Sequence, residues 1–305
     1  MKYGMRYSDR LSDDTLAILL FHGVVEHDSH PLRNYNRKHL EKDAFADILK
    51  DMTDEGTALS LDDVVRFHNA GEPYPPKSFV VTFDDGFANN LTVAAPVLAD
   101  FNVPATVYIT TDFVENNRMS WIDRIEWAIE ETPKVGLTLP WNSESVNAGD
   151  VEDKRALLDD IRSHVKSDAS IDPDILATDI QLQCGLSETW STLDPLDLKL
   201  TWEQVRELGN DSLFIVGGHT HTHAILSFLD ENELADELDT SLTLLRDNAG
   251  VGNTHYSYPE GLAHCYSDTV IAALKARGVV CCPTAIDGVN TPDVDLFNLK
   301  RVPVV

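Results

Sequence analysis

The stretch FVVTFDDGFANN, residues 79–90, joins an apolar run to two adjacent carboxylates and a glycine. Phe79 to Phe83 have the β-branched and aromatic composition of a buried strand, and an Asp-Gly step commonly turns the chain. A plain turn would explain the Asp-Gly step by itself. It does not explain why two acidic side chains, Asp84 and Asp85, stand directly after so apolar a strand.

Strand-like and helix-like segments alternate on both sides of this stretch. The predicted strands lie at 16–21, 79–83, 105–110, 212–218, 255–259, 279–285 and 297–305. The predicted helices lie at 39–56, 60–71, 89–102, 120–131, 201–209, 230–250 and 267–278. This alternation predicts an α/β fold of βα units around a parallel sheet, and about seven such units favour a closed barrel over a doubly wound sheet. Because no glycine-rich phosphate-binding motif follows a strand, a nucleotide site has no support.

Residues 132–200 differ from their surroundings. They are polar, rich in Asp and Ser, and carry few strand signals, while helices are predicted at 152–167 and 173–183. We therefore expect one domain, residues 1–305, that carries a mostly helical insertion at about 132–200.

The charge of the chain limits its partners. Its 305 residues include 51 acidic and 24 basic ones, for a formal charge of −27. This charge repels phosphate backbones and anionic membranes, so a nucleic-acid partner is not expected. No apolar run reaches roughly 18 residues, so no membrane span is expected. The first residues lack a signal-peptide layout, which predicts a cytoplasmic protein with reduced cysteines.

Three histidines, His219, His221 and His223, directly follow the predicted strand at 212–218. In an extended segment all three would share one face, whereas in a helical turn only His219 and His223 would. The Gly217-Gly218 pair before them indicates that the strand has ended, which favours the His219/His223 pair. Two imidazoles and one carboxylate form a three-ligand metal set with an open position for water.

All these polar residues stand at the predicted carboxyl ends of strands, and in a barrel those ends share one mouth. One carboxylate of the Asp84-Asp85 pair would ligate the cation, and the other would accept a proton from bound water. His22, which follows the strand at 16–21, would protonate a leaving nitrogen if it points into the same mouth. The alternative is that His22 is a packed side chain with no role in catalysis, which is the commoner case for a single histidine after a strand. The convergence predicts an enzyme.

At these residues the chain resembles the polysaccharide deacetylases of carbohydrate esterase family 4, which share the NodB homology domain. Their T-F-D-D-G motif matches Thr82 to Gly86, and their H-[ST]-x-x-H motif matches His219 to His223. The likeness covers about residues 16–130 and 200–303. It implies a distorted (β/α)7 TIM-like barrel and the metal-dependent removal of an N-acetyl group from an amino sugar.

The resemblance also implies roles for single residues. Asp84 matches the catalytic base, and the matches to the metal ligands are Asp85, His219 and His223. Zn²⁺ is the default cation for such a set, and Co²⁺, Ni²⁺ or Fe²⁺ would also fit it. The stretch LLFHGV resembles the N-terminal histidine motif of poly-N-acetylglucosamine deacetylases, which makes His22 the general acid.

The third motif of the family departs from its usual form. The matching stretch, HYSYPEG at 255–261, resembles an F-x-Y-P-x-G version and places Tyr258 and Pro259 at the substrate or the oxyanion. It lacks the arginine that orients the base in the family, and Arg301 is the residue that would replace it. The late L-x-x-H motif has no match near the C-terminus.

The resulting hypothesis is an N-deacetylase that acts on an N-acetylated sugar or oligosaccharide in polysaccharide or glycoconjugate biosynthesis. One alternative is an amidohydrolase that removes another N-acyl or N-formyl group from a sugar-linked substrate. Another is a non-catalytic carbohydrate-binding barrel, which the presence of Asp84 and of all three ligand residues disfavours.

Overall fold

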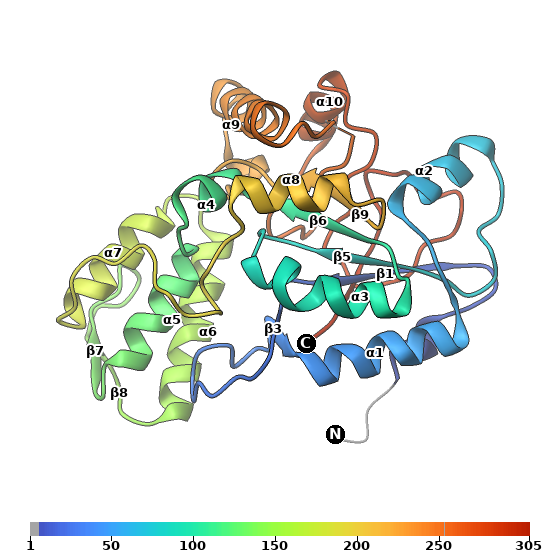
Figure 1. Cartoon of the computed structure of the whole chain (residues 1–305). Coiled ribbons are helices and arrows are strands. Elements are labelled where there is room, and N and C mark those ends of the chain that lie inside the picture. The colour runs from blue at the N-terminus through green and yellow to red at the C-terminus, as the bar shows by residue number, and fades with distance from the viewer. Residues whose placement is uncertain (1–5, 253) are drawn as a thin grey trace. The chain divides into compact units, whose positions relative to one another are not determined.

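The computed structural model describes residues 6–252 and 254–305, which form two compact units. The barrel unit comprises the described residues of Met1–His27, His39–Asn117 and Lys199–Val305 (Figure 1). The helical unit comprises Asp28–Lys38 and Arg118–Leu198. Its second segment begins before the predicted insertion at 132–200. The expectation of one domain that carries an insertion stays a prediction.

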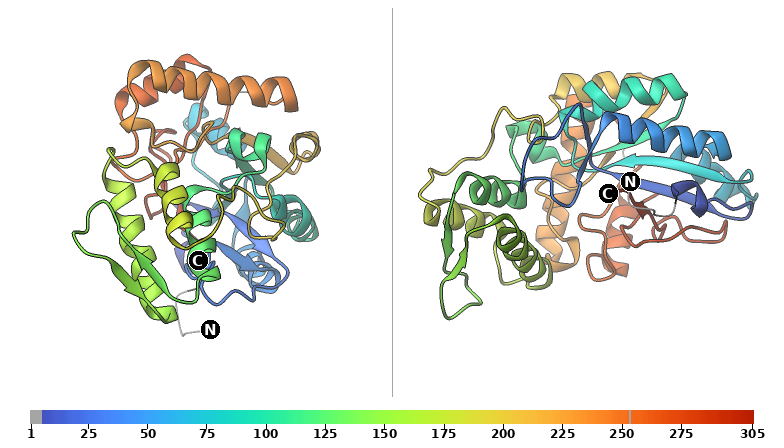
Figure 2. Two further views of the ribbon diagram at one scale, coloured as in Figure 1. Left: turned by 90° about the vertical axis from the view of Figure 1, so that its left-hand side faces the viewer. Right: turned by 90° about the horizontal axis from the view of Figure 1, so that it is seen from below.

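A parallel sheet forms the centre of the barrel unit (Figures 1 and 2). Its strand order is β10 (Val302–Pro303), β1 (Leu16–Phe21), β5 (Ser78–Phe83), β6 (Ala105–Ile109) and β9 (Phe214–Gly218). The short strand β4 (Thr57–Ala58) pairs with the start of β5. Every residue of β1 and β5 is buried, as expected for continuous apolar strands that are covered on both faces.

The ring closes beyond β9 through backbone that is mostly not regular strand. Gly218 pairs in parallel with Tyr256, and His255 pairs with Cys281. Thr284 N then donates to Leu299 O, and Val304 N donates to Leu20 O on β1. Seven chain segments therefore form a distorted TIM-like barrel, which confirms the predicted α/β class.

The regular strands predicted at 255–259, 279–285 and 297–305 are largely absent from the described residues, and only β10 is assigned there. Each of the three segments contains a proline, namely Pro259, Pro283 or Pro303. Proline has no N–H to donate to a strand partner, so these segments pair over only a few residues.

Helices and short strands surround the sheet. Most of the helices lie near their predicted positions, whereas the short helix at 111–116 and the short strands at 23–25 and 39–41 were not predicted. In the barrel unit these helices and short strands are β2 (Gly23–Val25), β3 (His39–Glu41), α1 (Lys42–Glu55), α2 (Leu61–Ala70), α3 (Ala95–Phe101), α4 (Thr111–Asn116), α8 (Trp202–Asn210), α9 (Glu231–Leu244) and α10 (Asp268–Ala276). Side-chain caps fix several starts, as at α2, where Ser60 and Asp63 form a capping box. The Phe45 ring of α1 packs edge-on against Phe21 and Phe83, with ring centroids 5.2 and 5.8 Å away. This apolar layer supports β1 and β5 beneath the residues that follow them.

The helical unit contains α5 (Trp121–Glu131), α6 (Val151–Ser167) and α7 (Pro173–Gln183) around its own apolar core (Figure 1). An antiparallel hairpin of β7 (Val135–Leu137) and β8 (Val146–Ala148) joins α5 to α6, and the sequence did not predict it. At 17 residues, α6 is the longest helix described. Within the described residues, no helix is both long enough and apolar enough to cross a membrane.

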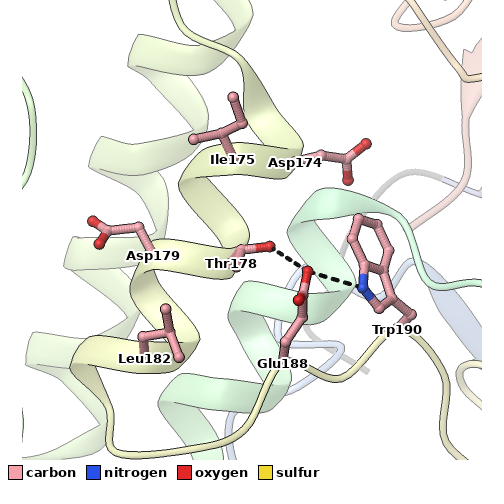
Figure 3. Close-up of a pocket in the computed structure, with 7 residues that line it drawn as sticks. All are labelled: Asp174, Ile175, Thr178, Asp179, Leu182, Glu188 and Trp190. Atoms are coloured by element: carbon pink, nitrogen blue, oxygen red, sulfur yellow. Dashed lines mark hydrogen bonds between the residues drawn. The ribbon is translucent and has the colours of Figure 1, made fainter.

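An open pocket of the helical unit lies along α7 (Figure 3). Its lining residues are Asp174, Ile175, Thr178, Asp179, Leu182, Glu188 and Trp190. Glu188 Oε1 accepts hydrogen bonds from Thr178 Oγ1 at 3.1 Å and from Trp190 Nε1 at 3.0 Å. The Arg124 guanidinium stacks on the Trp190 ring, 3.5 Å from its centroid. None of the residues that line this pocket is a predicted site residue.

Candidate active site

The carboxyl ends of β5 and β9 bring three potential metal ligands together. Asp85, His219 and His223 each offer one ligand atom, and these atoms lie within 4.8 Å of one another. His219 Nε2 is 3.6 Å from Asp85 Oδ1, and His223 Nε2 is 3.3 Å from the same oxygen. The structure thus assembles the predicted trio from two distant stretches of the sequence.

A hydrogen bond fixes the imidazole of His219. Its Nδ1 lies 2.9 Å from the carbonyl oxygen of Ser257, which can only accept, so Nδ1 carries the proton and Nε2 keeps its lone pair. Burial lowers the pKa of His219 to about 4, which keeps the ring neutral. A neutral imidazole whose other nitrogen is bound to a carbonyl is the usual form of a metal-ligating histidine. One carboxylate oxygen and two imidazole nitrogens at this spacing therefore fit a divalent cation such as Zn²⁺.

The third histidine of this stretch does not join the trio. His221 Nδ1 lies 2.9 Å from Thr111 Oγ1 instead. The expected helical turn is also wrong, because Thr220 and His223 have left-handed φ values of +65° and +66°. Two left-handed residues, rather than one helical turn, bring His219 and His223 to the same point.

Asp84 forms a buried bidentate ion pair with Arg301. Arg301 Nη1 donates to Asp84 Oδ1 and Nη2 donates to Oδ2, both at 2.8 Å. Arg301 Nε donates to Thr284 O at 2.6 Å, and the arginine side chain is fully buried. Burial alone would raise the pKa of Asp84, but the Arg301 guanidinium, together with the nearby His219 and His22, lowers this pKa below its ordinary value. Asp84 is therefore ionised at neutral pH, in the arrangement expected of a carboxylate that an arginine orients.

His22 lies at the same mouth, directly after β1. Its carbonyl oxygen accepts a hydrogen bond from Asn90 Nδ2 at 2.8 Å, and its side chain is half-buried. A positive charge on His22 is among the influences that lower the pKa of Asp84. The histidine and the carboxylate therefore lie close enough to interact.

The two predicted substrate or oxyanion residues are buried. The Tyr258 hydroxyl donates to Phe297 O at 3.1 Å, and its ring stacks on Tyr266 with centroids 4.4 Å apart. Pro259 follows it and is also buried. These contacts place the Tyr258 side chain in the protein interior, and the role of both residues at the substrate stays a prediction.

Ser257 is a site residue that sequence reasoning missed. Its hydroxyl donates to Asp84 Oδ1 at 3.3 Å and lies 2.7 Å from His219 Nδ1. Ser257 thus joins the carboxylate that Arg301 holds to one of the three potential ligands. Its place in HYSYPEG, between the two tyrosines, was the only available signal in the sequence.

The sequence matches the protein family described as polysaccharide deacetylase over residues 71–282, which is more than half of the chain. A comparison with curated protein sequences finds no match.

Solved structures share this fold over nearly the whole chain. Streptococcus pyogenes deacetylase PplD, in complex with acetate, is 17% identical with a TM-score of 0.61, over 96% of this chain and 94% of that one. IcaB from Ammonifex degensii is 18% identical with a TM-score of 0.59, over 97% and 94%. The BpsB deacetylase domain from Bordetella bronchiseptica is 18% identical with a TM-score of 0.58, over 96% and 97%. With the family match and both motifs in place, this chain belongs to the polysaccharide deacetylase family.

Proposed function

We propose that this protein is a metal-dependent N-deacetylase that hydrolyses the acetamide of an N-acetylated amino sugar in polysaccharide or glycoconjugate biosynthesis. Membership of the family supports the reaction class. The observation that carries the proposal is the three-donor set of Asp85, His219 and His223 beside an ionised Asp84. A cytoplasmic location, which the sequence analysis expects, stays a prediction.

The residues divide into a cation site and a proton-transfer pair. Asp85, His219 and His223 would hold the cation, most simply Zn²⁺, with Co²⁺, Ni²⁺ and Fe²⁺ as fitting substitutes. A bound cation of this kind polarises a carbonyl and makes water a stronger acid. Asp84 accepts the proton of the attacking water, because a carboxylate bound to one arginine keeps further lone pairs. Arg301 keeps that carboxylate ionised and fixes its orientation.

Chelation should separate this proposal from its alternatives. Stripping the protein with dipicolinate should abolish amine release from N-acetylglucosamine oligomers, and adding Zn²⁺ back should restore it. The assay is repeated on N-formyl and N-propionyl sugars, so that preference for another acyl group becomes visible. Full activity of a cation-free protein would contradict metal dependence. Binding of oligosaccharide without release of any amine would favour the non-catalytic barrel.

His22 is proposed as the acid that protonates the leaving amine. His22→Asn should lower kcat for amine release by about 10²-fold, because an amide cannot deliver a proton to the nitrogen as the bond breaks. The matched control is His27→Asn, which changes an exposed histidine of the same unit and should leave kcat unchanged. Comparable kcat values for the two variants would remove His22 from the mechanism.

A further inference from the structure

The segment that carries both proposed histidine ligands, residues 219–223, is here called the ligand loop. Its backbone is strained, because Thr220 and His223 are left-handed, and a β-branched residue such as threonine rarely adopts this conformation. Strain of this kind persists only where the surroundings hold the chain in place. The contacts of the ligand loop show what holds it.

A glutamate of α9 binds the middle of the ligand loop. Glu237 Oε1 accepts hydrogen bonds from His221 N at 2.8 Å and from Thr222 N at 2.6 Å. Both oxygens of the same carboxylate lie 3.1 Å from Thr222 Oγ1, which donates to them. These hydrogen bonds connect the loop to a helix of 14 residues.

Two further side chains complete the set. The Tyr256 hydroxyl accepts from Thr220 N at 2.8 Å, and Thr220 Oγ1 accepts from His223 N at 2.9 Å. A Cβ at Gly218 would lie 2.3 Å from the Tyr256 ring, so the glycine makes room for this tyrosine. Every backbone N–H from residue 220 to residue 223 therefore donates to a side-chain oxygen.

From these contacts we infer that Glu237 is a positioning residue of the cation site, supported by Tyr256. The two side chains hold the left-handed turns that bring His219 Nε2 and His223 Nε2 within reach of Asp85. A cation that meets a loop already ordered does not have to order it on binding, so its affinity is higher. The inference rests on the metal site of the proposed function, and it assigns no chemical step to Glu237.

The test measures Zn²⁺ affinity on the full chain by competition with a chromophoric chelator, in the absence of any sugar. Glu237→Ala should weaken Zn²⁺ binding by about 10–100-fold, a loss similar to that from removing a side chain that orients a metal ligand, because Glu237 holds the loop that carries two of the ligands. Glu237→Gln should stay within about threefold of the unmodified protein, because its amide oxygen can accept from the same two N–H groups. Asp236→Ala removes an equal charge from an exposed neighbour on α9 and should not change the affinity.

The contrary results of these affinity measurements would overturn either the inference or the metal site of the proposed function. Unchanged affinity in Glu237→Ala would overturn the inference. An equal loss in Glu237→Gln and Glu237→Ala would overturn it too, since charge rather than hydrogen bonding would then be responsible. Tyr256→Phe should bind Zn²⁺ about tenfold more weakly than the unmodified protein. Unchanged Zn²⁺ affinity in Tyr256→Phe would overturn the inference, and this test remains decisive if Glu237→Ala does not fold. Absence of Zn²⁺ binding by the unmodified protein would instead contradict the metal site of the proposed function.

Discussion

Asp84→Asn is expected to lower kcat for amine release by about 10²–10⁴-fold. The asparagine amide has nearly the shape of the carboxylate but cannot accept the proton of the attacking water. Because Asp84 lies outside the three-donor set, Zn²⁺ affinity should stay within about threefold of the unmodified protein. The measurement pairs steady-state kinetics with the chelator competition described above.

Asp100→Asn is the matched control, because it makes the same chemical change at an exposed position of α3. It should retain full activity. Urea unfolding of Asp84→Asn shows whether lost activity reflects lost structure, since this variant also removes the counter-charge of Arg301. A kcat within tenfold of the unmodified protein would contradict the role as base, and a parallel loss of Zn²⁺ affinity would make Asp84 a ligand instead.

Arg301→Met should reduce the free energy of unfolding by about 3–5 kcal/mol. The change leaves Asp84 buried with its charge uncompensated, and it also removes the hydrogen bond to Thr284 O. Without the guanidinium, burial dominates and the pKa of Asp84 rises, so the base is less ionised at neutral pH. Urea titration measures the first effect, and amine release measures the second.

The control for Arg301→Met is Arg277→Met, which breaks an ion pair nearer the surface. Arg277 donates to both carboxylate oxygens of Asp239 at 2.7 and 3.0 Å, and the Asp239 side chain is 64% exposed. Arg277→Met should cost less than about 1 kcal/mol, because water solvates the carboxylate left behind. Equal losses in the two variants would show that burial adds nothing to the importance of the Arg301–Asp84 pair.

Local patterns in the sequence predicted most of the regular elements. Strand β1 was predicted at its observed residues and β5 within one residue, because both are apolar runs bounded by polar residues. Helix α7 was also predicted at its observed bounds, since a capping Asp172 and Pro173 mark its start. The β7–β8 hairpin was missed because its three-residue strands are too short to show a period.

The site was predicted only in part, for a similar reason. The Asp84-Asp85 and His219–His223 stretches are local signals, and each reveals itself in a few neighbouring residues. Glu237 carries no such signal, and Ser257 has only its place in the HYSYPEG stretch, because the two residues lie 16 and 38 residues from their partners in the ligand loop. Their contribution follows from tertiary packing, which a single sequence does not display. Arg301 became a candidate only because the usual arginine of the third motif was missing.

The hydrogen bond between residues 304 and 20, which closes the barrel, limits how much of the barrel can form during synthesis on the ribosome. A ribosome releases β1, β5, β6 and β9 well before residues 301–304, so the four central strands can pair while the rest is still being synthesised. The bond from Val304 N to Leu20 O spans nearly the whole sequence and has to wait. Arg301 arrives in the same late segment, so Asp84 gains its counter-charge only at that stage. A nascent chain therefore contains the proposed ligands and the base long before it can hold the base in position.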